Sequence, residues 1–131
     1  MNQPAIIQYL QQHIPNLLGV WAFGSRISGG ARADSDLDLA VLVAGYADTV
    51  RLFELAGELE DICHCPVDLL DLRAASTVMQ HQVITTGQLW WAADVQAALY
   101  ETFILGEKIR LDEARAGILA DIKQRGTVYG G

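Results

Sequence analysis

The stretch GSRISGGARADSDLDLAVLV, residues 24–43, decides how this chain folds. The apolar run LLGVWAF (17–23) ends directly before it, and a second apolar run, LDLAVLV (37–43), closes it. Short runs of this kind are typical of buried strands. The polar, glycine-bearing segment between them is long enough for the chain to reverse direction. We therefore expect two antiparallel strands, with the start of the second beside the end of the first.

The rest of the chain alternates helical and strand-like patterns. Apolar residues recur at spacings of three and four over 48–62, which predicts an amphipathic helix. We expect further helices over about 4–13, 74–87 and 94–124, and strands over 67–72 and 89–93. No repeat or linker divides the sequence, so we predict one α/β domain over 1–131. It consists of a small mixed sheet flanked by helices, with a long C-terminal helix.

Several apolar side chains have expected orientations. The helix over 74–87 is expected to turn Val78 inward, together with other apolar residues on that side. Trp90 and Trp91 are neighbours in a predicted strand, so one should face the core and the other should face outward or meet a partner. Leu99, Phe103 and Ile104 of the last helix are expected to pack on the domain.

Composition and charge restrict the function. A chain of 131 residues that is 51% hydrophobic and 19% charged can bury a core of its own. Its net charge of −7 is the wrong sign for a protein that follows a phosphate backbone, so we expect no direct nucleic-acid partner. The N-terminus has no basic region and no long apolar stretch, and the uncharged segment 74–93 is too polar to span a membrane. We expect a cytoplasmic protein without a membrane partner.

The sequence Cys63-His64-Cys65 suggests metal ligation at first sight. Adjacent side chains in an extended segment point to opposite faces, and no second cluster supplies the missing ligands. We therefore expect two small, partly buried thiols.

Two aspartates stand at the start of the second strand. Residues i and i+2 of a strand project from one face, so Asp36 and Asp38 present two carboxylates side by side. They could be merely the solvated start of a strand, with Asp34 and Ser35 as turn residues. The following run LAVLV is buried, however, and carboxylates at its edge need a partner. Oxygen ligands of this kind suit Mg²⁺ or Mn²⁺.

The turn after the first strand can bind the anion that such a cation accompanies. Gly24 lets backbone amides approach a phosphate without a Cβ in the way, and the Ser25 hydroxyl can donate to a phosphate oxygen. Arg26 and Arg32 flank this turn and could neutralise phosphate charge, with Arg26 the better candidate because it adjoins Ser25.

The pattern Gly24-Ser25, ten residues, then Asp36-Leu37-Asp38 resembles the signature of the polymerase-beta-like nucleotidyltransferase superfamily. The short length and the order of elements resemble the minimal nucleotidyltransferases, which are antitoxins of HEPN toxins. The resemblance implies a third carboxylate on the strand after the intervening helix. That residue maps to Asp68, with Asp71 as the alternative. The two face opposite sides of a strand, so only one can join the pair, and the position of Asp68 near the strand start favours it.

The resemblance also implies the reaction. ATP would bind through the Gly24-Ser25 turn, and Mg²⁺, as two ions, would be held by Asp36, Asp38 and Asp68. An acceptor hydroxyl would attack the α-phosphorus, and Asp68 would accept or steer its proton. The implied acceptor is a tyrosine of a HEPN toxin, which would form a hetero-oligomer with this antitoxin. Two alternatives stay open: neutralisation by binding alone, and adenylylation of a small molecule of the aminoglycoside type.

Overall fold

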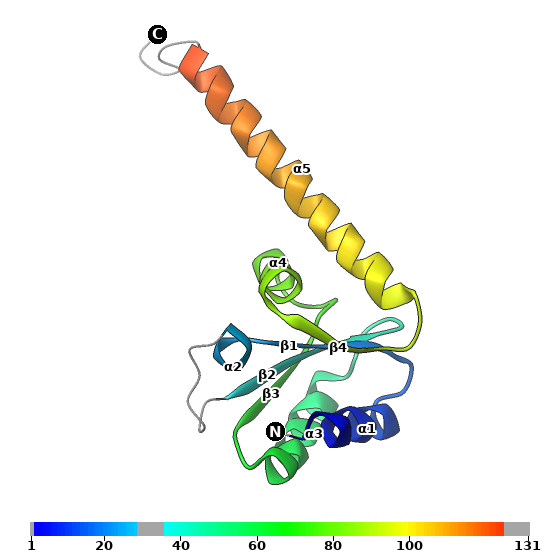
Figure 1. Cartoon of the computed structure of the whole chain (residues 1–131). Coiled ribbons are helices and arrows are strands. Elements are labelled where there is room, and N and C mark those ends of the chain that lie inside the picture. The colour runs from blue at the N-terminus through cyan, green and yellow to red at the C-terminus, as the bar shows by residue number, and fades with distance from the viewer. Residues whose placement is uncertain (1, 29–35, 125–131) are drawn as a thin grey trace.

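The structure, a computed structural model, describes residues 2–28 and 36–124, apart from the side chains of Arg26, Ser28 and residues 118–124 (Figure 1). Within these ranges it has helices and strands in the order expected from the sequence. The helices are α1 (Gln3–His13), α2 (Ser25–Ser28), α3 (Thr49–Cys63), α4 (Thr77–Thr86) and α5 (Gln96–Gln124). The strands are β1 (Leu17–Phe23), β2 (Leu37–Val43), β3 (Val67–Asp71) and β4 (Gln88–Ala92).

The strands form a mixed sheet in the order β3-β2-β1-β4. Strand β1 is antiparallel to both β2 and β4, and β2 is parallel to β3. The antiparallel return predicted for residues 17–43 is therefore confirmed. The parallel pair requires a crossover, which α3 provides. The prediction of a small mixed sheet with a long C-terminal helix is confirmed.

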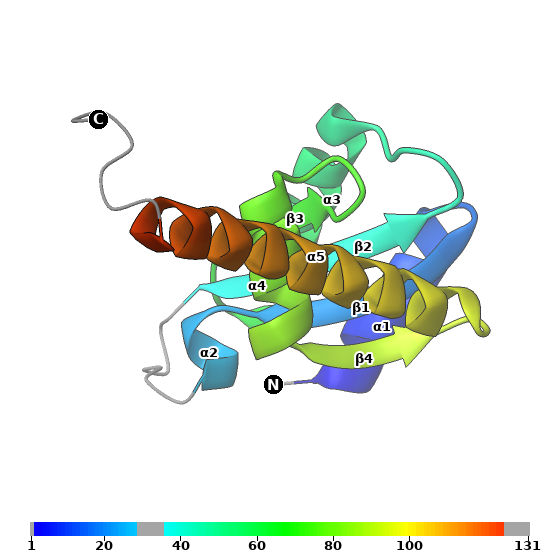
Figure 2. The same ribbon diagram turned by 90° about the horizontal axis from the view of Figure 1, so that it is seen from above.

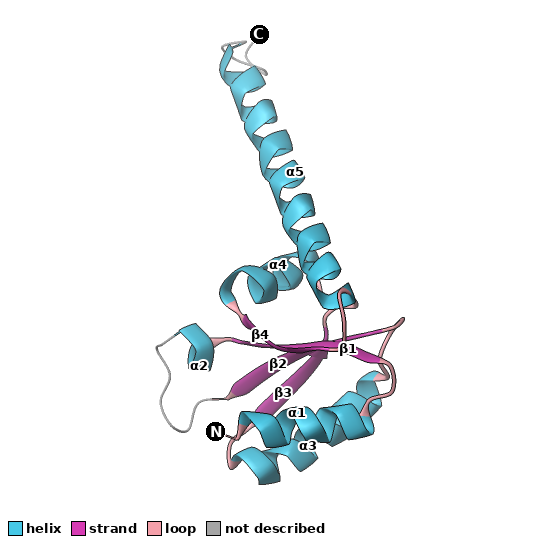
Figure 3. Cartoon of the chain, turned by 45° about the vertical axis from the view of Figure 1, so that its right-hand side comes forward, coloured by secondary structure: helices cyan, strands magenta, loops and turns pink. Residues whose placement is uncertain are grey.

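Helices cover both faces of the sheet (Figures 1 and 3). Helices α1 and α3 lie on one face, and α4 and α5 lie on the other. The side chains of β2 alternate accordingly: Leu39 and Val41 belong to the core under α1 and α3, whereas Ala40 and Leu42 belong to the core under α4 and α5. Because Asp38 is in phase with Ala40 and Leu42, its side chain projects from the α4/α5 face.

Local signals fix the ends of α3. The side chain of Asp48 accepts hydrogen bonds from the backbone N–H groups of Val50 and Arg51, which caps the first turn. His64 adopts a left-handed conformation, with φ of 57°, and ends the helix. The buried face of α3 includes Leu55 and Leu59, both fully buried. Each contributes about 1.5–3 kcal/mol relative to an exposed leucine, and together they hold the crossover against the sheet.

Trp90 and Trp91 do not face opposite sides, so that prediction is wrong. Both are partly buried and pack against the core under α1 and α3. The reason is a shift in the pairing of β1 with β4, where Val20 pairs with Trp91 but Trp21 pairs with Leu89. Trp90 is the extra residue of a bulge, which interrupts the alternation of a regular strand.

Three further expectations about helices are wrong. Val78 of α4 is 76% exposed, because α4 turns only Val83 fully into the core. Leu99 and Phe103 of α5 are 59% and 54% exposed, because α5 buries its opposite side instead.

The thiols of the Cys63-His64-Cys65 segment behave as expected, since Cys65 is buried and Cys63 is half-buried. Among the described residues, no helix combines the length and the apolar character that a membrane crossing requires.

Candidate active site

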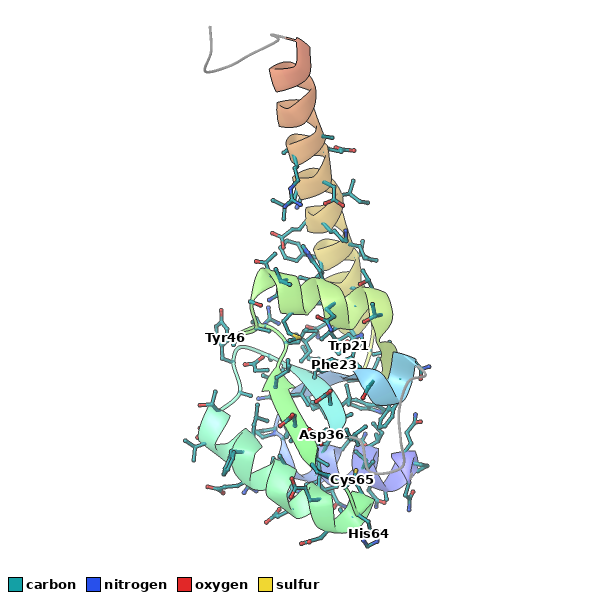
Figure 4. The ribbon with its side chains drawn as sticks, turned by 90° about the vertical axis from the view of Figure 1, so that its left-hand side faces the viewer. Trp21, Phe23, Asp36, Tyr46, His64 and Cys65 are labelled. Atoms are coloured by element: carbon teal, nitrogen blue, oxygen red, sulfur yellow. The ribbon has the colours of Figure 1, made fainter. Side chains whose placement is uncertain are left out.

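The sheet places the predicted site residues on three neighbouring strands. Phe23, the last residue of β1, pairs with Asp38 of β2, and Asp38 pairs with Asp68 of β3. Gly24 follows Phe23 directly, and Asp36 precedes β2 at the same end of the sheet (Figure 4). Residues 24, 36, 38 and 68 therefore meet at one end of the sheet, although 44 positions separate the first from the last.

Gly24 packs directly against Asp38. Its φ of +83° is a conformation that L side chains rarely adopt. A Cβ built on it would lie 2.2 Å from Oδ2 of Asp38. The carbonyl of Gly24 accepts a hydrogen bond from the N–H of Ile27 at 3.1 Å, and this bond starts the turn that leads into α2. Only glycine fits this turn, so the backbone after β1 lies beside a carboxylate oxygen. Spacing alone predicted the two residues at one end, but not this contact.

The carboxylates interact strongly with one another. The pKa of Asp38 is raised from its ordinary 3.8 to about 6, first by burial. The charge of Asp68, a hydrogen bond with Asp68 and the charge of Asp36 raise it further. Carboxylates this close share a proton or a cation, because their like charges repel. At neutral pH, where Asp38 is mostly ionised, the site favours a cation.

The two alternatives for the third carboxylate lie in different surroundings. Asp68 is exposed and interacts with Asp38. Asp71 is only 5% exposed and accepts hydrogen bonds from the N–H of Ala47 at 2.8 Å and from the N–H of Arg73 at 3.1 Å. Asp71 thus ties the loop after β2 to the loop after β3. It does not cap α4, whose first turn is capped by Ser76.

The donor set fits a hard divalent cation. All three side chains offer carboxylate oxygens, which such cations prefer. In the described part of the chain, no three acidic, histidine or cysteine side chains are gathered closely enough to hold a metal as they stand. Asp38 and Asp68 already touch, and Asp36 is near enough to raise the pKa of Asp38. These three carboxylates would be the ones to hold such a cation.

The basic residues predicted to bind phosphate fall outside what the structure describes. Arg32 lies in the segment 29–35, and the side chain of Arg26 is among those not described. Ser25 opens α2 with an exposed side chain, next to the turn at Gly24.

Comparison with known proteins assigns the family. Residues 5–96 match the family model described as polymerase beta, nucleotidyltransferase. The chain belongs to this family. The nucleotidyltransferase is 35% identical to the protein adenylyltransferase MntA of Shewanella oneidensis over 122 residues, which cover 93% of this chain and 88% of MntA. The family resemblance read from the sequence is thus confirmed, and the protein is an enzyme.

Solved structures agree with this assignment. A crystal structure of a toxin–antitoxin with AMP-PNP contains a chain that matches with a TM-score of 0.79 and 35% identity, over 94% of this chain and 99% of that one. A structure of tri-AMPylated Shewanella oneidensis HEPN toxin in complex with MNT antitoxin contains a chain that matches with a TM-score of 0.73 and 34% identity, over 93% of this chain and 96% of that one. The fold of this nucleotidyltransferase is therefore similar, over more than nine tenths of its length, to that of the chains matched in these complexes.

Proposed function

We propose that this nucleotidyltransferase transfers AMP from ATP to a tyrosine hydroxyl of a HEPN toxin and thereby acts as its antitoxin. The observation that carries the proposal is the packing of the Gly24 turn against Asp38, which in turn contacts Asp68. This arrangement joins a phosphate-binding turn to a cation-binding pair. It occurs in a chain that is similar along almost its whole length to a protein adenylyltransferase.

Each residue has a separate role in this proposal. The backbone N–H groups after Gly24 and the hydroxyl of Ser25 hold the phosphates of ATP, with Arg26 beside them. Asp36, Asp38 and Asp68 hold the divalent cation, for which we propose Mg²⁺ as two ions. When bound, the cation neutralises charge on the triphosphate and on the leaving pyrophosphate.

The transfer itself is one displacement at phosphorus. The acceptor oxygen forms a bond to the α-phosphorus, and the bond from that phosphorus to the bridging oxygen breaks, which releases pyrophosphate. The exposed carboxylate of Asp68 accepts the hydroxyl proton or steers its departure. The contribution of the chain is to position the groups and to balance charge, since the hydroxyl and the phosphorus carry the covalent chemistry. We place the reaction in the cytoplasm, where ATP is available.

The test separates catalysis from neutralisation by binding alone. Catalytic amounts of the protein with ATP and Mg²⁺ are expected to silence the toxin. The intact mass of the toxin should rise by whole adenylyl units, and silencing should persist after the two proteins are separated. The control is the double variant Asp36→Asn with Asp38→Asn, which should leave the toxin unmodified and active. A toxin that is fully neutralised by this double variant, in a lasting complex and without a change of mass, would show that binding alone suffices.

A further inference from the structure

Gly87 alone connects helix α4 to strand β4. The helix ends at Thr86, and the strand begins at Gln88. The N–H of Gly87 donates to the carbonyl of Val83 at 2.9 Å, which closes the last turn of the helix. Figure 2 shows the start of β4 at the same end of the sheet as α2. One residue therefore joins a helix to a strand at the end of the sheet that carries the candidate site.

Gly87 packs against the end of β1. Ala22 of β1 pairs with Gln88, so Gly87 lies across from Phe23, the last residue of β1. A Cβ at position 87 would lie 2.4 Å from the carbonyl oxygen of Val83, 2.8 Å from that of Ala22 and 3.1 Å from Cβ of Phe23. The two oxygens belong to the backbone and cannot rotate away. The φ of −86° suits any residue, so glycine is required here for space.

The end of β1 is thus confined from both sides. On the β4 side it contacts Gly87. On the β2 side Phe23 pairs with Asp38, and a Cβ on the next residue, Gly24, would lie 2.2 Å from Oδ2 of Asp38. Ser25 and helix α2 follow directly. A displacement of Phe23 away from Gly87 would therefore change the distance between the turn after β1 and the carboxylate of Asp38.

We propose that Gly87 is a positioning residue, whose close contact with the end of β1 sets the Gly24-Ser25 turn at the distance from Asp38 that a nucleotide requires. The inference rests on the proposed function, in which this turn holds the phosphates of ATP. Gly87 touches neither the nucleotide nor the reacting atoms and acts only through β1. Displacements of about 1 Å are large enough to matter, because they can cost an enzyme about a hundredfold in rate.

The experiment compares Gly87→Ala with Gly19→Ala. Gly19 lies on the same strand, and a Cβ there would lie 2.9 Å from Cη2 and Cζ3 of Trp21 and 3.1 Å from Cβ of Ala97. Both substitutions therefore create a steric overlap at β1, and both are expected to lower the thermal midpoint. Gly19 is four positions before Phe23, however, which is about 13 Å along a strand. Only Gly87→Ala disturbs the end of β1 that leads into the turn.

The readout is nucleotide affinity, measured by calorimetry at a temperature at which both variants are folded. In Gly87→Ala, the Kd for ATP with Mg²⁺ is expected to rise at least about tenfold, as for the loss of one hydrogen bond to a charged group. The Kd for AMP, which lacks the two outer phosphates, should rise less than about threefold. In Gly19→Ala, both constants should stay within about twofold of the wild type. A general loss of stability would not separate ATP from AMP in this way.

Two outcomes would overturn the inference. Gly87→Ala could bind ATP like the wild type, or Gly19→Ala could lose as much affinity, and in either case Gly87 serves stability alone. If Gly87→Ala does not fold, insertion of a second glycine after Gly87 loosens the connection without an overlap. It should weaken ATP binding in the same way, and unchanged affinity would again refute the inference. Because nucleotide binding needs no acceptor, a wild type that binds ATP but transfers no AMP to the toxin contradicts the proposed function alone.

Discussion

At the scale of single residues, the surroundings of Asp38 favour a bound cation and destabilise the folded protein when no cation is bound. Its pKa of about 6 means that the folded protein binds a proton there more tightly than the unfolded chain does. The negative charge on Asp38 is therefore a cost to folding that a bound cation would remove.

This cost predicts a pH-dependent effect of Asp38→Asn in the absence of metal. The raised pKa lowers the stability of the wild type as pH rises from about 4 to above 6, because the carboxylate ionises in the folded state. The variant has no such group. In the presence of a chelator, its thermal midpoint should exceed that of the wild type at pH 8, and the difference should vanish near pH 4. A difference of equal size at both pH values would contradict this explanation.

Changing Asp71 to asparagine is expected to lower stability, whereas changing Asp68 to asparagine is expected to abolish activity. In the wild type, two backbone N–H groups donate to the carboxylate oxygens of Asp71. In Asp71→Asn, one of these donors faces an amide N–H₂ group, which cannot accept its hydrogen bond. It should lower the free energy of unfolding by about 1–3 kcal/mol. Asp68→Asn should leave stability nearly unchanged and abolish AMP transfer, while ATP binding persists.

Urea denaturation and single-turnover transfer, measured on both variants, check this pair of predictions. If Asp71→Asn abolished transfer and Asp68→Asn did not, the assignment of the third carboxylate would have to be reversed.

At the scale of elements, the bond between Trp21 and Glu101 joins α5 to the sheet. Trp21 is 1% exposed, and its indole N–H loses the carboxylate that accepts its hydrogen bond when leucine replaces Glu101. Glu101→Leu should reduce the free energy of unfolding by about 1–3 kcal/mol. Glu101→Gln keeps an acceptor oxygen and serves as the control, with a smaller loss. If urea denaturation shows the same loss of unfolding free energy in both variants, the hydrogen bond does not contribute to stability.

The sequence predicts the elements better than it predicts the faces they bury. The apolar runs and the spacing from Gly24 to Asp38 were enough to place the first two strands, because each pattern matches the period of its element. The inward or outward direction of Trp90 depends on a bulge, which arises from pairing with a strand some 70 positions away. The exposure of Val78, Leu99 and Phe103 depends on how α4 and α5 sit on the sheet, and no local pattern contains that information.

The same distinction holds for the candidate site. The aspartates share a face by the two-residue period of strands, which a sequence shows directly. The burial of Asp71 between two loops could not be foreseen, because Ala47 comes from a distant part of the chain.

At the scale of the whole molecule, ligand binding is expected to appear as added stability. ATP with Mg²⁺ at about 100 times its Kd should raise the free energy of unfolding by about 2.7 kcal/mol, which a thermal shift assay detects. In the double variant Asp36→Asn with Asp38→Asn, the Mg²⁺-dependent part of the shift should disappear. A shift that survives both this variant and a chelator would place the nucleotide elsewhere on the molecule.

The two cores on either side of the sheet are made from different portions of the chain. The core under α1 and α3 draws its buried residues from positions 6–67, whereas the core under α4 and α5 also needs Leu72, Val83 and Ala97. During synthesis the N-terminal part emerges first. The first core, and with it Asp36, Asp38 and Asp68, can therefore assemble on the ribosome before α5 exists. Trp21 belongs to the second core, so its indole is fully covered only once the first turns of α5 have packed on the sheet and Glu101 has accepted its hydrogen bond.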